Sequence, residues 1–183
     1  MKTREIIKYS SLLLLIAGII TAAVFIYRRY LPHKEEKKTE NRTIVCIGDS
    51  LTFGYGVMNN RLKEAWPYLL DEMLDEYEVL NYGISGATAA KTGRKAYSGS
   101  FLDQAIEINA DIYFYMLGSN DAKNLSLTAE QFRSDSLRII ERIINETKGE
   151  LIILLPCPVF EVSGKTNSFG IRNEAIESII IPV

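Results

Sequence analysis

The sequence predicts an α/β domain in which a parallel β-sheet lies between two layers of helices, a three-layer αβα sandwich, with a transmembrane helix before it. The domain is predicted because short apolar runs alternate with amphipathic helical stretches from residue 43 onward. Such alternation is typical of parallel sheets covered on both faces. The transmembrane helix is predicted by one long uncharged stretch near the N-terminus. A chain of 183 residues has room for one domain and an appendage.

The uncharged stretch covers residues 9–27, which are 19 consecutive positions without a charged side chain. As a helix it would be about 28 Å long, close to the thickness of the hydrocarbon core of a bilayer. Arg28 and Arg29 follow it directly, where a cleaved signal peptide would end in small residues. We therefore predict an uncleaved membrane anchor over residues 1–30. Residues 31–42 have mixed charge and are typical of a solvated linker.

Residues 43–183 contain the predicted domain. Strands are indicated by apolar runs that are short enough for a buried parallel sheet, at residues 43–47, 78–82, 111–117 and 151–155. Helices are indicated by apolar side chains at helical spacing, over residues 63–77, 100–108, 128–149 and 173–180. Two local signals mark where helices begin. Pro67 has to lie in a first turn, and Thr128 with Gln131 forms a capping-box pattern.

The apolar faces of two helices can be read from the same spacing. In the first helix the predicted face consists of Leu69, Leu70, Met73 and Leu74. In the helix after Thr128 it consists of Phe132, Leu137, Ile140, Ile143 and Ile144. Cys46 and Cys157 each lie in or at the end of an apolar run, which favours buried free thiols and leaves a disulfide between them open.

Glycine and small polar residues follow three of the predicted strands. The segments are Gly48-Asp49-Ser50, Gly83-Ile84-Ser85-Gly86 and Gly118-Ser119-Asn120-Asp121. In open α/β sheets ligands bind beyond the carboxyl ends of the strands. The three segments are therefore predicted to meet in one functional site.

These residue types fit acyl transfer. A serine at a strand-to-loop turn can present its hydroxyl at the rim of the sheet. The tetrahedral intermediate then needs hydrogen-bond donors aimed at its oxyanion. The N–H of Ser50, the N–H of Gly86 and the side-chain amide of Asn120 are the candidates, because glycine leaves access to its amide and asparagine donates without a charge.

The three segments resemble, in order, the first three sequence blocks of SGNH/GDSL hydrolases. Gly48-Asp49-Ser50-Leu51 is similar to the first block, residues 81–88 to the second, and residues 118–121 to the third. The resemblance implies an SGNH, flavodoxin-like fold and a serine esterase or acylhydrolase. It implies that Ser50 is the nucleophile and that Ser50, Gly86 and Asn120 form the oxyanion hole. Asp49 is expected to brace its loop by accepting backbone N–H bonds, and Asp121 is expected to order the turn that carries Asn120.

One part of the family pattern is missing from the sequence. The family's last block carries an aspartate and, three residues later, the histidine that acts as general base. The only histidine here is His33, in the charged linker, where a solvated side chain is expected. Serine is a weak nucleophile without a base. We therefore expect impaired catalysis, and we interpret the chain as incomplete at the C-terminus or as a genuine short form with little activity.

The sequence leaves three hypotheses for the function. The first is a carboxylic-ester hydrolase acting on a small ester, an acetylated glycan or a lipid. The second is a non-catalytic, membrane-tethered binding module that keeps the pocket without the base. A nucleotide-binding domain is disfavoured because neither G-x-G-x-x-G nor G-x-x-x-x-G-K-[ST] occurs. No cofactor or metal is expected, since no Cys/His spacing fits zinc, and a net charge of −2 gives no reason to expect nucleic acid.

The orientation in the membrane has two interpretations. Three Lys or Arg residues precede the apolar stretch and five lie between Arg28 and Lys38. The positive-inside rule would then place the domain in the cytoplasm. Anchored hydrolases of the type that the chain resembles usually face outward, and by that analogy we expect an extracytoplasmic domain on a single-pass anchor.

Overall fold

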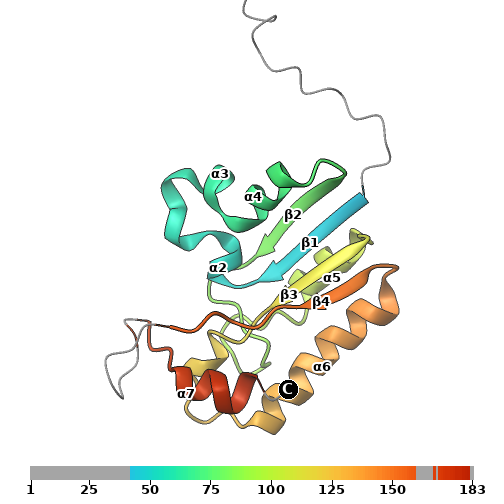
Figure 1. The fold of residues 1–183 in the computed structure, drawn as a ribbon. Helices are drawn as coiled ribbons and strands as arrows, with labels where there is room; N and C mark the ends of the chain where they lie inside the picture. Colours follow the sequence, from blue (N-terminus) through green and yellow to red (C-terminus); the bar gives the residue numbers. More distant parts are fainter. Residues whose placement is uncertain (1–41, 160–166, 168, 182–183) are drawn as a thin grey trace, which may run out of the picture. The chain divides into compact units, whose positions relative to one another are not determined.

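The computed structural model describes residues 42–159, 167 and 169–181. The sheet is parallel and contains four strands in the order β2-β1-β3-β4 (Figure 1). The strands are β1 (Arg42–Gly48), β2 (Tyr77–Gly83), β3 (Ile112–Met116) and β4 (Glu150–Ile153). The chain moves from β1 to β2 on one side and then crosses to β3 on the other side of β1. A reversal of this kind is the usual position of a ligand site in open α/β sheets. The α/β prediction and its parallel sheet are confirmed.

The helices of the described part of the chain lie between and after the strands. They are α2 (Ser50–Phe53), η1 (Tyr55–Asn60), α3 (Arg61–Glu64), α4 (Trp66–Met73), α5 (Ser100–Glu107), η2 (Asp121–Lys123), α6 (Ala129–Glu146), α7 (Asn173–Ala175) and η3 (Ile176–Ile180). The predicted capping box of α6 is present. The Thr128 hydroxyl accepts from the Gln131 N–H at 3.2 Å, and the Gln131 side chain accepts from the Thr128 N–H at 3.0 Å.

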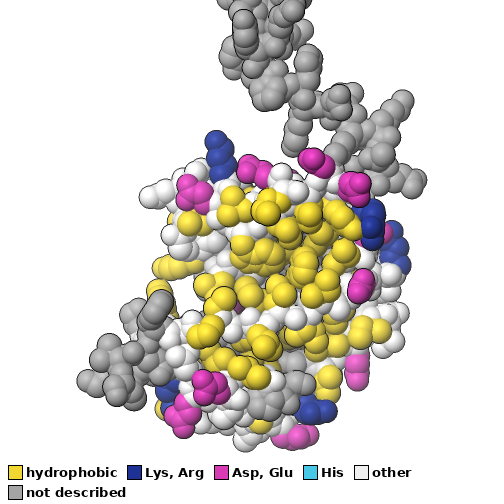
Figure 2. Space-filling model, viewed as in Figure 1, with side chains coloured by type: hydrophobic (Ala, Val, Ile, Leu, Met, Phe, Trp, Pro, Cys, Tyr) yellow, Lys and Arg dark blue, Asp and Glu magenta, His cyan; other side chains and the backbone are white. Residues whose placement is uncertain are grey.

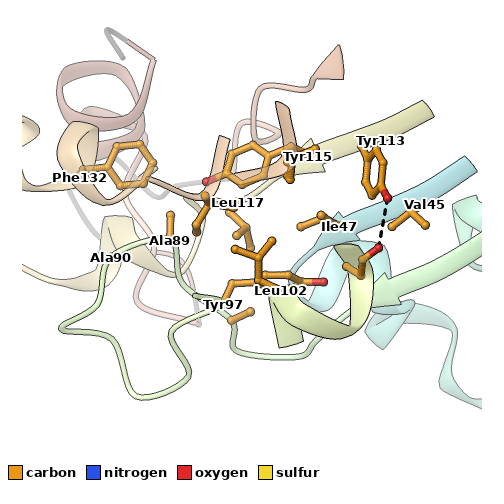
Figure 3. Close-up of a cluster of buried hydrophobic side chains, with 14 of the residues drawn as sticks. Val45, Ile47, Ala89, Ala90, Tyr97, Leu102, Tyr113, Tyr115, Leu117 and Phe132 are labelled. Carbon is orange, nitrogen blue, oxygen red and sulfur yellow. Dashed lines mark hydrogen bonds between the residues drawn. The ribbon is translucent and has the colours of Figure 1, made fainter. Parts of the chain in front are cut away.

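The larger core lies on one face of the sheet and is covered by α5 and α6 (Figure 3). Alternate residues of β1 and β3 point to this face because successive side chains of a strand point to opposite sides. These side chains and their helix partners are fully or almost fully buried: Val45, Ile47, Tyr113, Tyr115, Leu102, Ala105, Ile139 and Ile143. The Tyr113 hydroxyl donates to the Ala105 carbonyl of α5 at 3.3 Å, which satisfies its polar end inside the core.

The second core lies on the opposite face. It is built from Ile44, Cys46 and Val79, against which Trp66, Leu70 and Leu74 of the α4 region pack. The Trp66 ring meets the Phe114 ring edge-on, with centroids 6.2 Å apart. Helices therefore cover both faces, which is the predicted three-layer arrangement. Hydrophobic side chains nevertheless reach the surface across the strands (Figure 2), and no residue of the edge strand β4 is buried.

The structure corrects the first predicted helix. Residues 63–77 do not form one helix, because Ala65 is extended (φ −68°, ψ 138°) between α3 and α4. A continuous helix would bring the Pro67 ring against the carbonyl of Lys63, so the chain restarts its helix just before the proline. The predicted apolar face is half wrong, since Leu69 and Met73 are exposed and only Leu70 and Leu74 pack on the sheet.

Two further predictions need correction. The buried stripe of α6 is Phe132, Ser136, Ile139 and Ile143. Ile144 is 57% exposed. The predicted stripe therefore placed Leu137 and Ile140 where the structure buries the preceding residues, Ser136 and Ile139. Cys46 is a buried free thiol as predicted, whereas Cys157 is free and exposed. Its exposure follows from its place in the irregular segment after the edge strand β4.

The predicted membrane anchor, residues 1–30, and the linker up to residue 41 lie outside the described residues, and so does His33. Among residues 42–159, 167 and 169–181, no helix has the length and apolar character that a bilayer-spanning segment requires.

Candidate active site

The three glycine-containing segments leave the sheet at the same edge. The last residue of β1, Gly48, is paired in register with Gly83 at the end of β2 and with Met116 at the end of β3. The Ile84 N–H also donates to the Gly48 carbonyl at 2.9 Å, which holds the first two segments together just beyond the strands. Register therefore places the starts of all three segments side by side.

Two of the strand-end glycines are required by close packing of α2. A Cβ atom on Gly48 would lie 2.0 Å from the Thr52 hydroxyl oxygen, and one on Gly83 would lie 2.3 Å from the Phe53 backbone nitrogen. Real Cβ atoms do not approach other atoms so closely. The two glycines thus let the short helix α2 sit directly on the ends of β1 and β2, which fixes the position of its first residue, Ser50.

Ser50 is the partly buried first residue of α2. Asp49 precedes it as the N-cap, and the Asp49 Oδ1 atom accepts from the Leu51 N–H at 2.9 Å. Neither the N–H nor the hydroxyl of Ser50 has a hydrogen-bond partner within the described part of the chain. An N–H at the start of a helix has no partner inside the helix. Ser50 therefore combines an unengaged hydroxyl with an unengaged amide donor.

Asn120 connects the three segments. Its Nδ2 atom donates to the Ala87 carbonyl at 2.9 Å and lies 3.5 Å from the Asp49 Oδ2 atom. The first bond has ideal length, whereas the second is at the limit for a hydrogen bond. One amide hydrogen is thus held by the loop after β2, and the other is only weakly engaged beside the nucleophile segment. The weakly engaged hydrogen can be redirected to a ligand at small cost.

Gly86 precedes the residue that Asn120 binds. Its φ of 84° lies in the left-handed region that favours glycine. Within the described residues its N–H donates no hydrogen bond. A Cβ atom on Gly86 would meet only the Lys95 side chain, at 3.7 Å, so the space beside it is open. Gly86 offers a second unengaged backbone donor in the neighbourhood of Asn120.

Asp121 and Asp49 are both almost completely buried. The two oxygens of Asp121 accept from the Ala89 and Ala90 N–H groups at 3.0 and 2.8 Å. Burial raises the pKa of Asp121 to about 6, against the lowering effect of these two bonds. Burial likewise raises the pKa of Asp49, while the hydrogen bond from Leu51, a hydrogen bond from Ser119 and the charge of Lys123 oppose the shift.

The profile of the GDSL-like Lipase/Acylhydrolase family matches residues 46–179, which is most of the chain and includes all three segments. The chain belongs to this family. The resemblance to SGNH/GDSL hydrolases is thereby confirmed.

Individual proteins are similar to this chain in sequence or in fold. An acetylxylan esterase of Xylanibacter ruminicola is 27% identical in an alignment 154 residues long that covers 73% of this chain. The chain spans only 32% of that relative's length. Among solved structures, a G-D-S-L family protein of Desulfitobacterium hafniense DCB-2 matches with a TM-score of 0.56 and 24% identity, over 75% of this chain and 66% of the other. A family two carbohydrate esterase of Clostridium thermocellum, in complex with cellohexaose, matches with a TM-score of 0.51 and 15% identity. The match covers 67% of this chain and 45% of the other.

Several hydrogen-bonding groups of this candidate GDSL site could not be predicted from the sequence. The Ala87 carbonyl and the Ala89 and Ala90 amides are backbone atoms whose residue type gives no signal. Asp121 was expected to order the turn that carries Asn120, yet its side chain mainly holds the loop after β2. Lys123, whose charge acts on Asp49, could have been suspected from its position two residues after Asp121.

A general base is not found among the described residues. The single histidine of the sequence, His33, lies outside them. Asp49 and Asp121 have their oxygens engaged by N–H donors, which disfavours both as proton acceptors for Ser50. In the part of the chain that the structure describes, no group of three or more His, Cys, Asp or Glu side chains is placed to hold a metal ion.

Proposed function

We propose that this chain is a carboxylic-ester hydrolase that acts through an acyl-enzyme on Ser50. The observation that carries the proposal is the position of Asn120. Its amide contacts the Ala87 carbonyl and the Asp49 carboxylate, so one side chain brings the nucleophile segment, the glycine segment and its own segment together. Family membership supports the same chemistry.

The proposed mechanism uses three donors that have weak or no partners in the described chain. The Ser50 oxygen attacks the ester carbonyl, and the Ser50 proton passes to a base. The oxyanion receives hydrogen bonds from the N–H of Ser50, the N–H of Gly86 and the Asn120 amide hydrogen that faces Asp49. The alcohol leaves with a proton, and water then hydrolyses the acyl group on Ser50.

We propose that removal of the Ser50 proton limits the rate of this reaction. By resemblance, the family supplies its base from an Asp-x-x-His block, and this sequence contains no histidine besides His33. Loss of one member of a serine triad costs several orders of magnitude, but oxyanion binding leaves a residual rate. Hydrolysis by the 183-residue chain is therefore expected to be slow and still dependent on Ser50.

The substrates that we propose are acetyl esters of glycans. The acetylxylan esterase relative supports this class, although the chain covers only 32% of it. Lipid esters are the competing class that the sequence left open. A comparison of acetate release from acetylated xylooligosaccharides with fatty-acid release from short-chain lipid esters distinguishes them.

The test of the proposed activity compares three forms of the full chain. Acetate release from acetylated xylooligosaccharides is measured for wild type, Ser50→Ala and the matched control Ser134→Ala on the exposed surface of α6. We expect a slow rate that Ser50→Ala abolishes and Ser134→Ala preserves. Equal rates in wild type and Ser50→Ala would exclude Ser50 as nucleophile and would favour the non-catalytic binding module.

We further propose that residues 1–30 anchor the protein in a membrane and that the domain is extracytoplasmic. The proposal rests on the 19 uncharged residues at positions 9–27 and on the analogy with anchored hydrolases. The full chain should stay with membranes during alkaline carbonate extraction. Protease added to intact cells should cleave an outward-facing domain, and full protection of the domain would place it in the cytoplasm instead.

A further inference from the structure

A cleft of about 930 Å³ opens beside the proposed oxyanion hole. Gly86 and Asn120, two of the proposed oxyanion donors, line it. The rest of its wall comes from the loops that follow β2 and β3, at Ser85, Thr88, Ala90, residues 92–95, Asp121, Lys123, Asn124 and Leu127. The part of a substrate that extends from the ester on this side must therefore lie in the cleft.

The wall of the cleft is cationic. Arg94, Lys95 and Lys123 line it, and Asp121 is the single carboxylate among its described lining residues. Both oxygens of Asp121 are engaged by the Ala89 and Ala90 amides, so Asp121 is not available to pair with the cations. The whole chain carries a formal net charge of −2. The charge of the cleft is thus opposite in sign to that of the protein.

The three cations are not used up by ion pairs. None of them forms a salt bridge with a described residue. The Lys95 ammonium donates to the Ser85 carbonyl at 2.9 Å, which fixes it next to Gly86 without neutralising its charge. A cleft lined by one sign of charge concentrates ligands of the opposite sign. Arg94 adds a planar fork that matches carboxylate and phosphate.

The remaining lining residues include several that can form hydrogen bonds with a saccharide. Ligand pockets are usually lined mainly by apolar and aromatic side chains. Here the described lining has no aromatic residue and its large apolar contribution is Leu127, whereas Ser85, Thr88, Thr92 and Asn124 supply hydroxyl and amide groups. The described lining therefore has no aromatic ring on which a flat apolar alcohol could stack.

We propose that this cleft binds an anionic group on the alcohol part of the ester, so that the preferred substrates are acyl esters of acidic saccharides. The proposal rests on the esterase function proposed above and narrows its substrate class. A carboxylate, as in a uronic acid, and a sugar phosphate share the chemistry that Arg94, Lys95 and Lys123 recognise. Neutral glycan esters are bound less tightly, because they leave the three cations without an anionic partner.

The test measures binding, so that it does not depend on turnover. The full 183-residue chain carrying Ser50→Ala is titrated at low ionic strength with three probes: trigalacturonate, glucose 1-phosphate and neutral xylotriose. A charge-assisted hydrogen bond contributes about 1.5–3 kcal/mol, so at least one anionic probe should bind roughly tenfold or more tightly than xylotriose. The anion that binds more tightly identifies the group.

Charge variants show where the anion binds. Arg94→Gln combined with Lys123→Gln should weaken binding of the anionic probe by roughly tenfold or more. Lys91→Gln removes one positive charge, half of the charge that the double variant removes, from an exposed residue of the same loop that does not line this cleft, and should change binding by less than about twofold. Circular dichroism verifies that each variant is folded.

Two results would overturn the proposal: equal affinity for the anionic and neutral probes, or an anionic affinity that the double variant and Lys91→Gln change equally. These results are distinct from a failure of the esterase function. That failure would appear as equal hydrolysis by the wild type and by Ser50→Ala, whatever the probes bind.

Discussion

Asn120 is the residue whose side chain joins the loops of the proposed site. It contacts the loop after β2 through the Ala87 carbonyl and the nucleophile segment through Asp49. The 2.9 Å bond orients the amide group, and the 3.5 Å contact leaves its second hydrogen nearly unengaged. One strong bond that orients the amide, together with a weakly engaged hydrogen on the same nitrogen, is the kind of preorganisation that stabilises an oxyanion with little reorganisation.

Replacement of Asn120 tests this role. Removal of one oxyanion donor from a serine hydrolase costs about 10²–10³ in kcat, and we expect Asn120→Ala to lower the Ser50-dependent rate by that factor with little change in KM. The measurement is hydrolysis of 4-nitrophenyl acetate by the full chain, corrected for Ser50→Ala. Asn145→Ala, on the exposed surface of α6, is the matched control. A loss in kcat below about threefold would remove Asn120 from the oxyanion hole.

Asp121 should make the stability depend on pH. Its pKa is raised to about 6 in the folded protein, above the value near 4 of an unfolded chain. Between these values the folded state binds more protons than the unfolded state. The contribution of Asp121 to the unfolding free energy therefore falls as pH rises from about 4 to 6, by about 3 kcal/mol at most.

Two measurements check the pH dependence. Carbon-13 NMR of the Asp121 carboxyl group should show a midpoint near pH 6. Urea unfolding at pH 4, 5 and 6 should show a smaller fall in stability for Asp121→Asn than for wild type, because the variant cannot ionise there. A midpoint at or below pH 4 would show that the bonds from Ala89 and Ala90 outweigh burial.

At the scale of elements, the helix α2 is positioned by glycines. Gly48 and Gly83 leave space that Thr52 and the Phe53 backbone fill, so α2 rests on the ends of the two strands. The contact is to backbone and to a short buried side chain, which cannot move aside easily. The position of Ser50 therefore depends on residues that have no chemical role themselves.

Gly83→Ala should displace α2 from the strand end. Overpacking of this kind typically costs about 1–3 kcal/mol, and we expect that loss in urea unfolding together with slower acylation of Ser50. Gly56→Ala is the matched control, because a Cβ atom there meets nothing within 4 Å. It should change stability by less than about 0.5 kcal/mol. Equal stability of the two variants would contradict the close packing of α2.

The elements also show what a sequence can and cannot predict. The strands were predicted because buried parallel strands are continuous apolar runs. The stripe of α6 was misplaced because Ile139-Ile140 and Ile143-Ile144 are adjacent apolar pairs, and because the buried Ser136 interrupts the true stripe. The Tyr115 hydroxyl lies 3.5 Å from the Ser136 oxygen, a tertiary contact that no local pattern indicates.

At the scale of the whole molecule, burial of apolar side chains differs strongly between α6 and the edge strand β4. Ile139 of α6 is completely buried under the sheet, whereas Ile153 of the edge strand β4 is 54% exposed. Ile139→Ala should therefore cost about 2–5 kcal/mol. Ile153→Ala should cost less than about 1 kcal/mol, because much of its side chain already contacts water. Urea unfolding of both variants checks the difference, and similar losses would mean that β4 is covered in solution.

The order of the strands explains why the meeting of the three segments could be predicted although the contacts between them could not. Three segments that are distant in sequence had to meet once the strands were parallel and adjacent, and the register of Gly48 with Gly83 and Met116 places them side by side. The bonds that join the loops involve backbone groups of residues 87–90, which carry no signature in the sequence.

The central claim is that Ser50, Gly86 and Asn120 surround one acyl group. It is tested most directly by labelling the full chain with a fluorophosphonate while imidazole is added as an external base, and mapping the adduct by peptide mass spectrometry. We predict an adduct on Ser50 whose rate of formation increases with imidazole, and which Asn120→Ala slows by at least about tenfold. Labelling that avoids Ser50 at every imidazole concentration, or that Asn120→Ala leaves unchanged, would contradict the claim.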